Sequence, residues 1–439
     1  MNTIFVQKIR FWCRGLPAAS PYVLALALFL LPHLRAVAAP LTYQYQERIF
    51  TIDPGKHPAW RKNIEHYAFG ELEIALSAEE ARDLPAGVER SGETVWDRRA
   101  IAETLEKEIG GALNHETGHV RIFRNDAHAI AFEGTGFPGR TLDTPLAAAL
   151  TIKALAKDVR LIQLPVRETP PLVQVDDPEL TGLGIREVVS VGESDFTGSP
   201  KNRKHNIGVG LRKFNGSLIP QGKEFSFGAV LGTVDASTGY LNELTIRGDR
   251  TKPEYGGGLC QVSTTAFRGV WQAGFPITER INHSFAVRYY SPEGTDATVY
   301  PPVKDMRFVN DSPGALLIQT LTEDDHAYFL YYGTRRQDRE TELAGPFTWD
   351  IVPPPPDRTV FTTEIPPGET QILGKAVPGM KTMWYRIVRE NGRERQEPFY
   401  SHYEARPYFE EIGVFPDDPR LMTEMIEDHN QNAGIAPTP

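Results

Sequence analysis

Hydrophobic positions early in the chain recur first with the period of a helix and then with that of a strand. Ile101, Leu105 and Ile109 share one face of a predicted helix over 98–110, which two glycines end. A second helix is predicted over 144–157, and strands are predicted at 120–123, 127–132 and 159–164. We therefore expect residues 41–170 to form an α+β domain, with a proline-containing linker over 167–180.

Beyond residue 183 the pattern changes from helical to extended. Residues 284–290 and 326–332 alternate or are continuously apolar, which predicts strands. One helix is predicted, over 261–273, because Val262, Ala266 and Val270 lie three to four positions apart. Region 184–335 is therefore expected to be a strand-rich domain with one buried helix.

The last part of the chain reads as a small all-β domain. A run of four prolines predicts a stiff linker over 345–358. Alternation over 382–388, followed by Asn391-Gly392, predicts strands and a hairpin within residues 359–415. The polar residues 416–439 are expected to be a flexible tail. The fold class predicted for the whole chain is multidomain α+β.

The first 38 residues have the pattern of an export signal. Lys8, Arg10 and Arg14 precede an apolar run over 22–31, and Ala36-Val37-Ala38 offers small residues for cleavage. The run is about half the ~20 residues that a membrane-spanning helix needs. We expect a cleaved signal peptide, with a retained anchor as the alternative. Membrane contact would then be transient, and the mature protein would reside in the cell envelope, periplasmic or wall-associated.

The net negative charge of the chain argues against some classes of binding partner. Loss of residues 1–38 removes four basic residues and no acidic one, so the net charge goes from −10 to −14. A chain this acidic is not drawn to nucleic acid or to an anionic membrane surface by long-range attraction. The expected partner is a zwitterionic or weakly charged polymer, and the sequence leaves the oligomeric state open.

Cys260 is the residue on which any covalent chemistry would centre. The other cysteine, Cys13, lies in the predicted signal, so Cys260 has no partner for an internal disulfide. It is either an inert core side chain or a nucleophile. Three glycines precede it and the predicted helix follows it. The start of a helix favours a thiolate and offers N–H groups to a developing oxyanion.

His283 is the candidate base for this thiol. It precedes the strand predicted at 284–290, a short distance along the chain from the predicted helix. An imidazole can accept the thiol proton and later protonate the leaving amine. Asp296 is the candidate acid that would orient the imidazole. A core cysteine and a structural histidine remain the alternative interpretation of the same two residues.

Five blocks of sequence between residues 184 and 335 resemble the VanW family, in the family's order. The blocks are Phe225-Ser226-Phe227, Gly232-Thr233 through Gly239-Tyr240, Gly256 through Thr265, Glu279-Arg280 through His283-Ser284, and Gly294 through Val299. The sequence departs from the family at Phe267-Arg268, where members usually carry Tyr-Asn. That departure concerns contacts near the motif and leaves the motif itself intact.

The resemblance implies an L,D-transpeptidase that acts on the stem peptides of peptidoglycan and needs no cofactor and no metal. Cys260 takes the position of the nucleophile, His283 matches the family's histidine, and Asp296 matches a polar position. The expected substrate-binding residues are Gly257, Gly258, Gln261, Ser263, Thr264 and Arg280. The alternative is a non-catalytic protein that binds peptidoglycan. An accessible Cys260 within reach of a His283 ring nitrogen would favour the enzyme.

The flanking regions carry weaker resemblances. Residues 41–170 resemble the peptidoglycan-binding domain that is often found before a VanW domain. Residues 359–415 resemble a five-glycine domain, a type associated with cell-wall polymers. Its glycines correspond here to Gly368, Gly374, Gly379, Gly392 and Gly413.

The segment His115-Glu116-Thr117-Gly118-His119 matches the H-E-x-x-H pattern of zinc proteases. That pattern binds zinc only on a continuous helix, where both imidazoles share one face. Here Gly110-Gly111 precede the segment, Gly118 interrupts it and a predicted strand follows. We therefore predict a helix-to-strand connection rather than a metal site.

Overall fold

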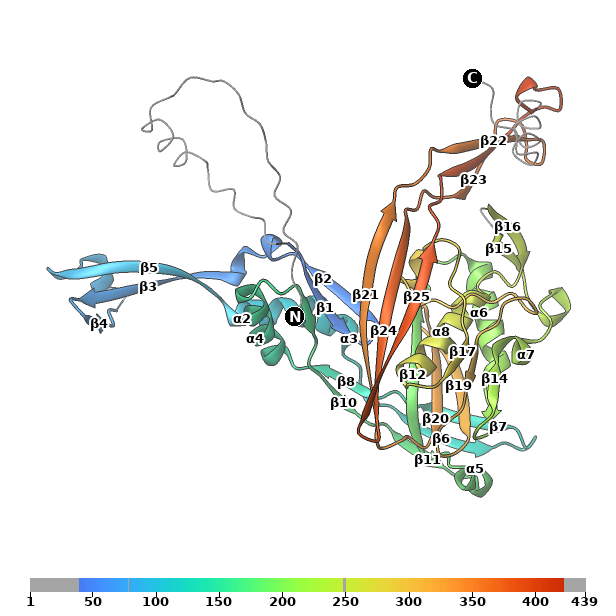
Figure 1. The fold of residues 1–439 in the computed structure, drawn as a ribbon, viewed down its shortest axis with the longest axis horizontal. Helices are drawn as coiled ribbons and strands as arrows, with labels where there is room; N and C mark the ends of the chain where they lie inside the picture. The colour runs from blue at the N-terminus through green and yellow to red at the C-terminus, as the bar shows by residue number, and fades with distance from the viewer. Residues whose placement is uncertain (1–38, 78, 248–249, 422–439) are drawn as a thin grey trace, which may run out of the picture.

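The computed structural model describes residues 39–421, apart from residues 78 and 248–249. The predicted signal at 1–38 and most of the predicted tail lie outside the described residues. Several small sheets make up an elongated molecule, with a large body at one end and a thin arm at the other (Figure 1). No helix within the described ranges is both long and apolar enough to cross a membrane. The fold is α+β in the broad sense predicted.

The N-terminal region holds one helical core and a projecting arm. Trp60, Ile101 and Leu105 are fully buried in this core. Its elements are β1 (Leu41–Tyr45), β2 (Arg48–Ile52), β9 (Leu161–Gln163), α2 (Arg98–Leu105), the π-helical turn η4 (Glu106–Gly110), α3 (Gly111–Leu113) and α4 (Thr144–Ala156). The arm consists of β3 (Arg61–Phe69), β4 (Leu72–Ile74) and β5 (Val88–Trp96) and extends away from the body (Figure 1).

The rest of the N-terminal region packs beneath the central sheet. Val120 and Ile122 share a core with Tyr332 of that sheet. The elements are β6 (His119–Arg124), β7 (Ile130–Thr135), β8 (Gly139–Leu142), β10 (Val166–Thr169), β11 (Leu172–Val175) and α5 (Pro178–Gly182). The predicted linker after residue 166 is therefore structured, because β10 pairs with β8 and β11 pairs with β6.

The central domain surrounds one long buried helix. Its main sheet has the order β12 (Glu187–Asp195), β20 (His326–Gly333), β19 (Leu316–Glu323), β13 (Leu218–Ile219). A second sheet contains β14 (Glu224–Ser226), β18 (Arg307–Val309) and β17 (Ile277–Glu279), and β15 (Asn242–Arg247) pairs with β16 (Arg250–Tyr255). The helices are α6 (Lys201–Phe214), α7 (Phe227–Leu231) and α8 (Leu259–Gln272). Helix α8 lies against β12 and β20.

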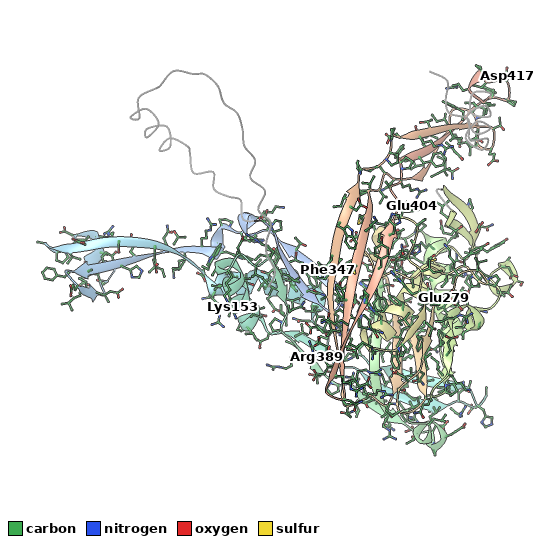
Figure 2. The ribbon with its side chains drawn as sticks, in the orientation of Figure 1. Lys153, Glu279, Phe347, Arg389, Glu404 and Asp417 are labelled. Atoms are coloured by element: carbon green, nitrogen blue, oxygen red, sulfur yellow. The ribbon has the colours of Figure 1, made fainter. Side chains whose placement is uncertain are left out.

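The C-terminal sheet covers the other side of α8. Trp271 on α8 packs edge-on against Trp384 and against Phe399, so the two regions share one core. The sheet consists of β21 (Arg339–Val352), β24 (Gly379–Glu390) and β25 (Arg393–Tyr403). A smaller sheet beyond it contains β22 (Arg358–Thr362), β23 (Thr370–Gly374) and β26 (Phe409–Gly413). Figure 2 shows the long sheet, with Phe347 and Glu404 labelled, beside the central domain, where Glu279 is labelled.

Four local predictions were wrong. Residues 284–290 form no strand; they are irregular apart from the short helix η6 (Arg288–Tyr290). The carbonyls of Tyr289 and Tyr290 accept hydrogen bonds from the side chains of Gln261 and Arg268 on α8, and no strand ladder forms along this segment. The strand predicted at 127–132 begins only at Ile130, because the Asn125 side chain caps a turn at 125–129.

The other two errors concern a helix and a linker. The central domain holds a second long helix, α6, which contains Gly208 and Gly210. A Cβ at Gly210 would lie 2.7 Å from Leu259 Cδ2, so this glycine allows α6 to pack closely on α8. The linker predicted over 345–358 is mostly strand, since β21 continues to Val352.

Two other predictions agree with the structure. Asn391 and Gly392 have φ of 52° and 70° between β24 and β25, as a tight hairpin requires. His115 to Gly118 connect α3 to β6, which begins at His119, so the H-E-x-x-H match does not lie on a helix.

Candidate active site

Cys260 lies in the first turn of α8. Gly258 caps this helix with a φ of +116°, a conformation that side-chain-bearing residues rarely adopt. The thiol is therefore at the positive end of the helix dipole, which favours a thiolate. Cys260 is partly exposed, whereas most of α8 behind it is buried. Its Sγ lies 3.5 Å from Thr298 Oγ1 and 3.7 Å from Val299 O.

His283 and Asp296 form a buried pair beside this thiol. His283 Nδ1 lies 2.5 Å from Asp296 Oδ2, and the His283 backbone N–H donates to the same oxygen at 2.7 Å. The two residues are 4% and 2% exposed, respectively. The ring of Tyr290 stacks on the imidazole with centroids 4.5 Å apart. Asp296 therefore fixes Nδ1 as the protonated nitrogen and leaves Nε2 for the thiol.

The His283 imidazole and the Cys260 thiol influence each other electrostatically without an aligned hydrogen bond. Among the described residues, His283 Nε2 is buried and has no partner at hydrogen-bonding geometry. Cys260 and His283 nevertheless shift each other's pKa, so the two groups are close. A contact that is near but not yet aligned is common in enzymes without substrate.

The pKa values of the three groups favour an ion pair. Burial raises the pKa of the Cys260 thiol, but His283 and the Thr298 hydroxyl lower it, to about 7. Burial lowers the pKa of His283, but Asp296 and Cys260 raise it to about 9. Burial raises the pKa of Asp296, but the hydrogen bond and charge of His283, with Arg280 and Tyr403, bring it well below its usual range. A thiolate and an imidazolium are therefore stabilised together.

Asp296 is held by donors from two regions of the chain. Arg280 Nη2 donates to Asp296 Oδ1 at 3.1 Å, and Arg280 Nε donates to the Asp296 backbone carbonyl at 2.6 Å. Tyr403, from β25, donates its hydroxyl to the same Oδ1 at 2.6 Å. The carboxylate thus accepts four hydrogen bonds, which explains why it stays charged although buried.

The other predicted site residues have partners inside the protein. Gln261 accepts from Arg203 Nη2 at 2.9 Å and donates to Asp195 O at 3.2 Å. Ser263 donates to Ala297 O at 2.5 Å, and Thr264 accepts from Ala297 N at 3.0 Å. Ser263 and Thr264 therefore fasten α8 to the loop that carries Asp296, whereas Gln261 fastens it to α6 and β12. Their geometry suits positioning of the site more than contact with a substrate.

The glycines before Cys260 also lie against protein atoms. A Cβ at Gly257 would come within 2.9 Å of Glu243 O, and one at Gly258 would come within 3.1 Å of Arg203 O. Both positions therefore require a close backbone approach. Arg280 is engaged with Asp296, as described above, and with Ser401.

Sequence reasoning missed several residues that organise the site. Arg268, at the departure from the family pattern, is buried and donates to Glu193 O, Tyr290 O and Thr295 Oγ1. It holds the ends of the loop between Tyr290 and Asp296. The sequence offered no signal for Tyr403, which lies 107 residues from Asp296 and beyond the prolines.

A separate cleft of about 700 Å³ lies between the β1–β2 turn and the central domain. Arg48, Asp195, Arg288 and Tyr289 are among its lining residues, and Cys260 is not. Gln261, the residue after Cys260, connects this cleft to the site. Its side chain donates to the backbone carbonyls of Asp195 and Tyr289, which line the cleft.

Comparison with known proteins places similarity in the central domain. Residues 202–332 match the family described as VanW like protein. The "Uncharacterized protein YoaR" of Bacillus subtilis (strain 168) is 36% identical over 124 residues, which cover 28% of this chain and 41% of that protein. The "Vancomycin B-type resistance protein VanW" of Enterococcus faecalis (strain ATCC 700802 / V583) is 27% identical over 130 residues, which cover 28% of this chain and 47% of that protein.

The chain therefore spans less than half the length of these two relatives. A solved structure, "Crystal structure of HP0197-G5", aligns over 18% of this chain and all of its own length, at 15% identity and a TM-score of 0.09. A TM-score this low supports no argument about the fold.

Proposed function

Because residues 202–332 form a VanW-like domain, we propose that this chain is an exported cell-wall protein that acts as a cysteine acyltransferase on peptidoglycan stem peptides. The reaction would be that of an L,D-transpeptidase. The observation that carries the proposal is the partly exposed Cys260, at a helix N-terminus, beside the buried His283–Asp296 pair. That arrangement supplies a nucleophile, a base and a group that orients the base.

In the first step, the Cys260 thiolate attacks the carbonyl carbon of an L,D-amide bond. A C–S bond forms, and the negative charge moves to the carbonyl oxygen. The N–H groups of Leu259 and Gln261 already bond to Gly256 O and Gly258 O, so the Cys260 N–H is the amide we assign to this oxyanion. The C–N bond then breaks, and the leaving amine of the terminal D-residue takes the proton of His283 Nε2.

In the second step, the thioester is resolved. A side-chain amine of a neighbouring stem peptide attacks the thioester carbonyl, and His283 Nε2 accepts the proton that this amine loses. The C–S bond breaks and the thiolate is restored, leaving a cross-link between the two stems. Water in place of the amine gives hydrolysis and a shortened stem.

The alternative, a protein that only binds the wall, does not require these features. A binding protein needs neither a lone thiol with a lowered pKa nor a buried histidine that lowers it. Perturbed pKa values that arise from specific partners gather at catalytic sites. The geometry therefore favours the enzyme.

Export and wall attachment are parts of the same proposal. The signal pattern at 1–38 supports export, and the net charge of −10 argues against nucleic acid as a partner. We assign wall attachment to the regions that resemble a peptidoglycan-binding domain, 41–170, and a five-glycine domain, 359–415. In the structure, Gly368 and Gly392 lie in turns, and Gly374, Gly379 and Gly413 lie at strand ends.

The test is incubation of the protein with disaccharide-tetrapeptide, followed by mass spectrometry. The wild type should release the terminal residue or form dimers, and Cys260→Ala and His283→Ala should do neither. His402→Ala, an outward-facing histidine on β25, is the matched control and should retain activity. If wild type and Cys260→Ala leave the substrate equally unchanged while both bind intact wall, the protein is a binding module.

A further inference from the structure

The two oxygens of the Asp296 carboxylate accept hydrogen bonds from different sets of donors. Asp296 Oδ2 accepts from the ring and the backbone of His283. Asp296 Oδ1 accepts from Arg280 Nη2 and from the Tyr403 hydroxyl. The contacts of Oδ1 therefore fix the rotation of the carboxylate, and with it the direction in which Oδ2 faces the imidazole.

Both donors to Oδ1 depend on strand β25. Tyr403 belongs to it directly, is 2% exposed, and accepts a hydrogen bond from Gly294 N at 2.7 Å. Arg280 is held on its far side by Ser401 Oγ at 2.8 Å and by Tyr400 O at 3.2 Å. β25 lies outside residues 202–332, so the VanW-like region alone does not contain the groups that hold its own aspartate.

The loop that carries His283 and Asp296 is also fastened to the C-terminal sheet. Glu404 N donates to Ser284 O at 2.6 Å, and Asn282 Nδ2 donates to His402 O at 2.8 Å. At the other end of the loop, Trp384 Nε1 donates to Glu293 O at 2.8 Å. These contacts fix the position of strand β25, and therefore of Tyr403, relative to Asp296.

We propose that Tyr403 is a positioning residue of the active site, and that the C-terminal sheet completes the site by setting the rotation of the Asp296 carboxylate. This inference rests on the proposed function for its meaning in catalysis. It concerns the reactivity of the Cys260 thiol, however, and that can be measured without peptidoglycan.

Several charged and titratable groups face this cluster from other elements. Arg280 and Arg268 act on Asp296, and Arg203 acts on Tyr290. All three remain in place when only the Tyr403 hydroxyl is removed. A change in Cys260 reactivity in Tyr403→Phe therefore reports the loss of one hydrogen bond and not a change in net charge.

The test is the pH dependence of Cys260 alkylation by iodoacetamide, in the full chain carrying Cys13→Ser so that Cys260 is the single thiol. In Tyr403→Phe, Asp296 turns from His283, the imidazolium loses stabilisation, and the pKa of the thiol rises. We expect the alkylation curve to move up by about one pH unit, which makes the reaction about tenfold slower at pH 6. Ser401→Ala should move it in the same direction by less, because Arg280 keeps its bonds to Asp296.

Tyr385→Phe is the matched control. This tyrosine lies on β24, alternates in register with the inward-facing Trp384 and Arg386, and packs against Phe347. Its alkylation curve should coincide with that of the wild type. If the Tyr403→Phe and Ser401→Ala curves coincide with it as well, while circular dichroism shows both variants folded, the positioning role is wrong.

The two proposals fail separately. If the wild type leaves disaccharide-tetrapeptide unchanged but Tyr403→Phe still shifts the alkylation curve, the proposed function is lost and the positioning role stands. If the wild type is active, Tyr403→Phe should lower kcat about tenfold and leave KM unchanged, since Tyr403 is buried and its hydroxyl is engaged with Asp296 and Gly294. A rise in KM with an unchanged kcat would overturn the positioning role.

Discussion

The C-terminal sheet and the N-terminal arm are both three-stranded antiparallel sheets, yet they stand in opposite relations to Cys260. The C-terminal sheet turns Trp384, Arg386 and Tyr403 inward, and all three are buried against the central domain. The arm is exposed along most of β3 and β5 and projects away from the body (Figure 1). Sheet topology therefore does not decide which flanking region takes part in the site. The side chains on the inward face do.

The largest effect should follow from undocking the C-terminal sheet. Trp384 is fully buried against Trp271 and lies under Gly294, so Trp384→Ala should destabilise the fold by about 3–5 kcal/mol. It should also slow Cys260 alkylation, because the loop that carries Asp296 loses its support. Urea unfolding and alkylation kinetics measure the two effects. Trp349→Ala, on the outer face of the same sheet and 41% exposed, should cause little of either; equal losses in the two variants would refute docking through this face.

A second prediction concerns the pH dependence of the Cys260–His283 pair. The pKa of Cys260 is lowered to about 7 and that of His283 is raised to about 9, so the thiolate–imidazolium pair predominates between these values. Stem-peptide transfer should therefore rise as pH increases through about 7 and fall as pH increases through about 9, where the imidazolium loses its proton. Initial rates between pH 5 and 10 measure this. A flat pH–rate profile would show that the protonation of Cys260 and His283 does not affect the rate-limiting step.

The smallest effect should come from the arm. Replacing residues 66–91 with an Asn-Gly turn keeps the pairing of β3 and β5 nearest the body and removes the tip. The alkylation rate of Cys260 and its pH dependence should stay unchanged, because no hydrogen bond of the described arm residues reaches the loop that carries His283 and Asp296. A shift like the one expected for Tyr403→Phe would show that the arm, too, is coupled to the site.

The sequence was most informative where chemistry and local geometry coincide. Cys260 was singled out from a glycine run and a helix start, His283 from its place a short distance after that helix, and Asp296 as the acid that would orient the imidazole. In the structure His283 and Asp296 are in contact, and His283 lowers the pKa of Cys260. The hairpin at Asn391-Gly392 followed from the backbone angles that these residues allow.

The sequence failed where long-range contacts outweigh local preference. Helix α6 contains two glycines that lower helix propensity, and only its packing on α8 explains them. Residues 284–290 alternate like a strand but bond to side chains of α8 instead. Tyr403 looks like an ordinary strand residue, and nothing in a single sequence connects it to an aspartate 107 residues away.

The lowered pKa of a lone, partly exposed cysteine has a consequence for oxidative damage. A thiolate at neutral pH reacts with peroxide as well as with a carbonyl, giving a sulfenic acid. Cys260 is the one cysteine of the described residues, so no neighbouring thiol can trap this product as an internal disulfide. Further oxidation to the sulfinic acid would be irreversible, and recovery before that point would depend on a thiol or reductase supplied from outside the chain.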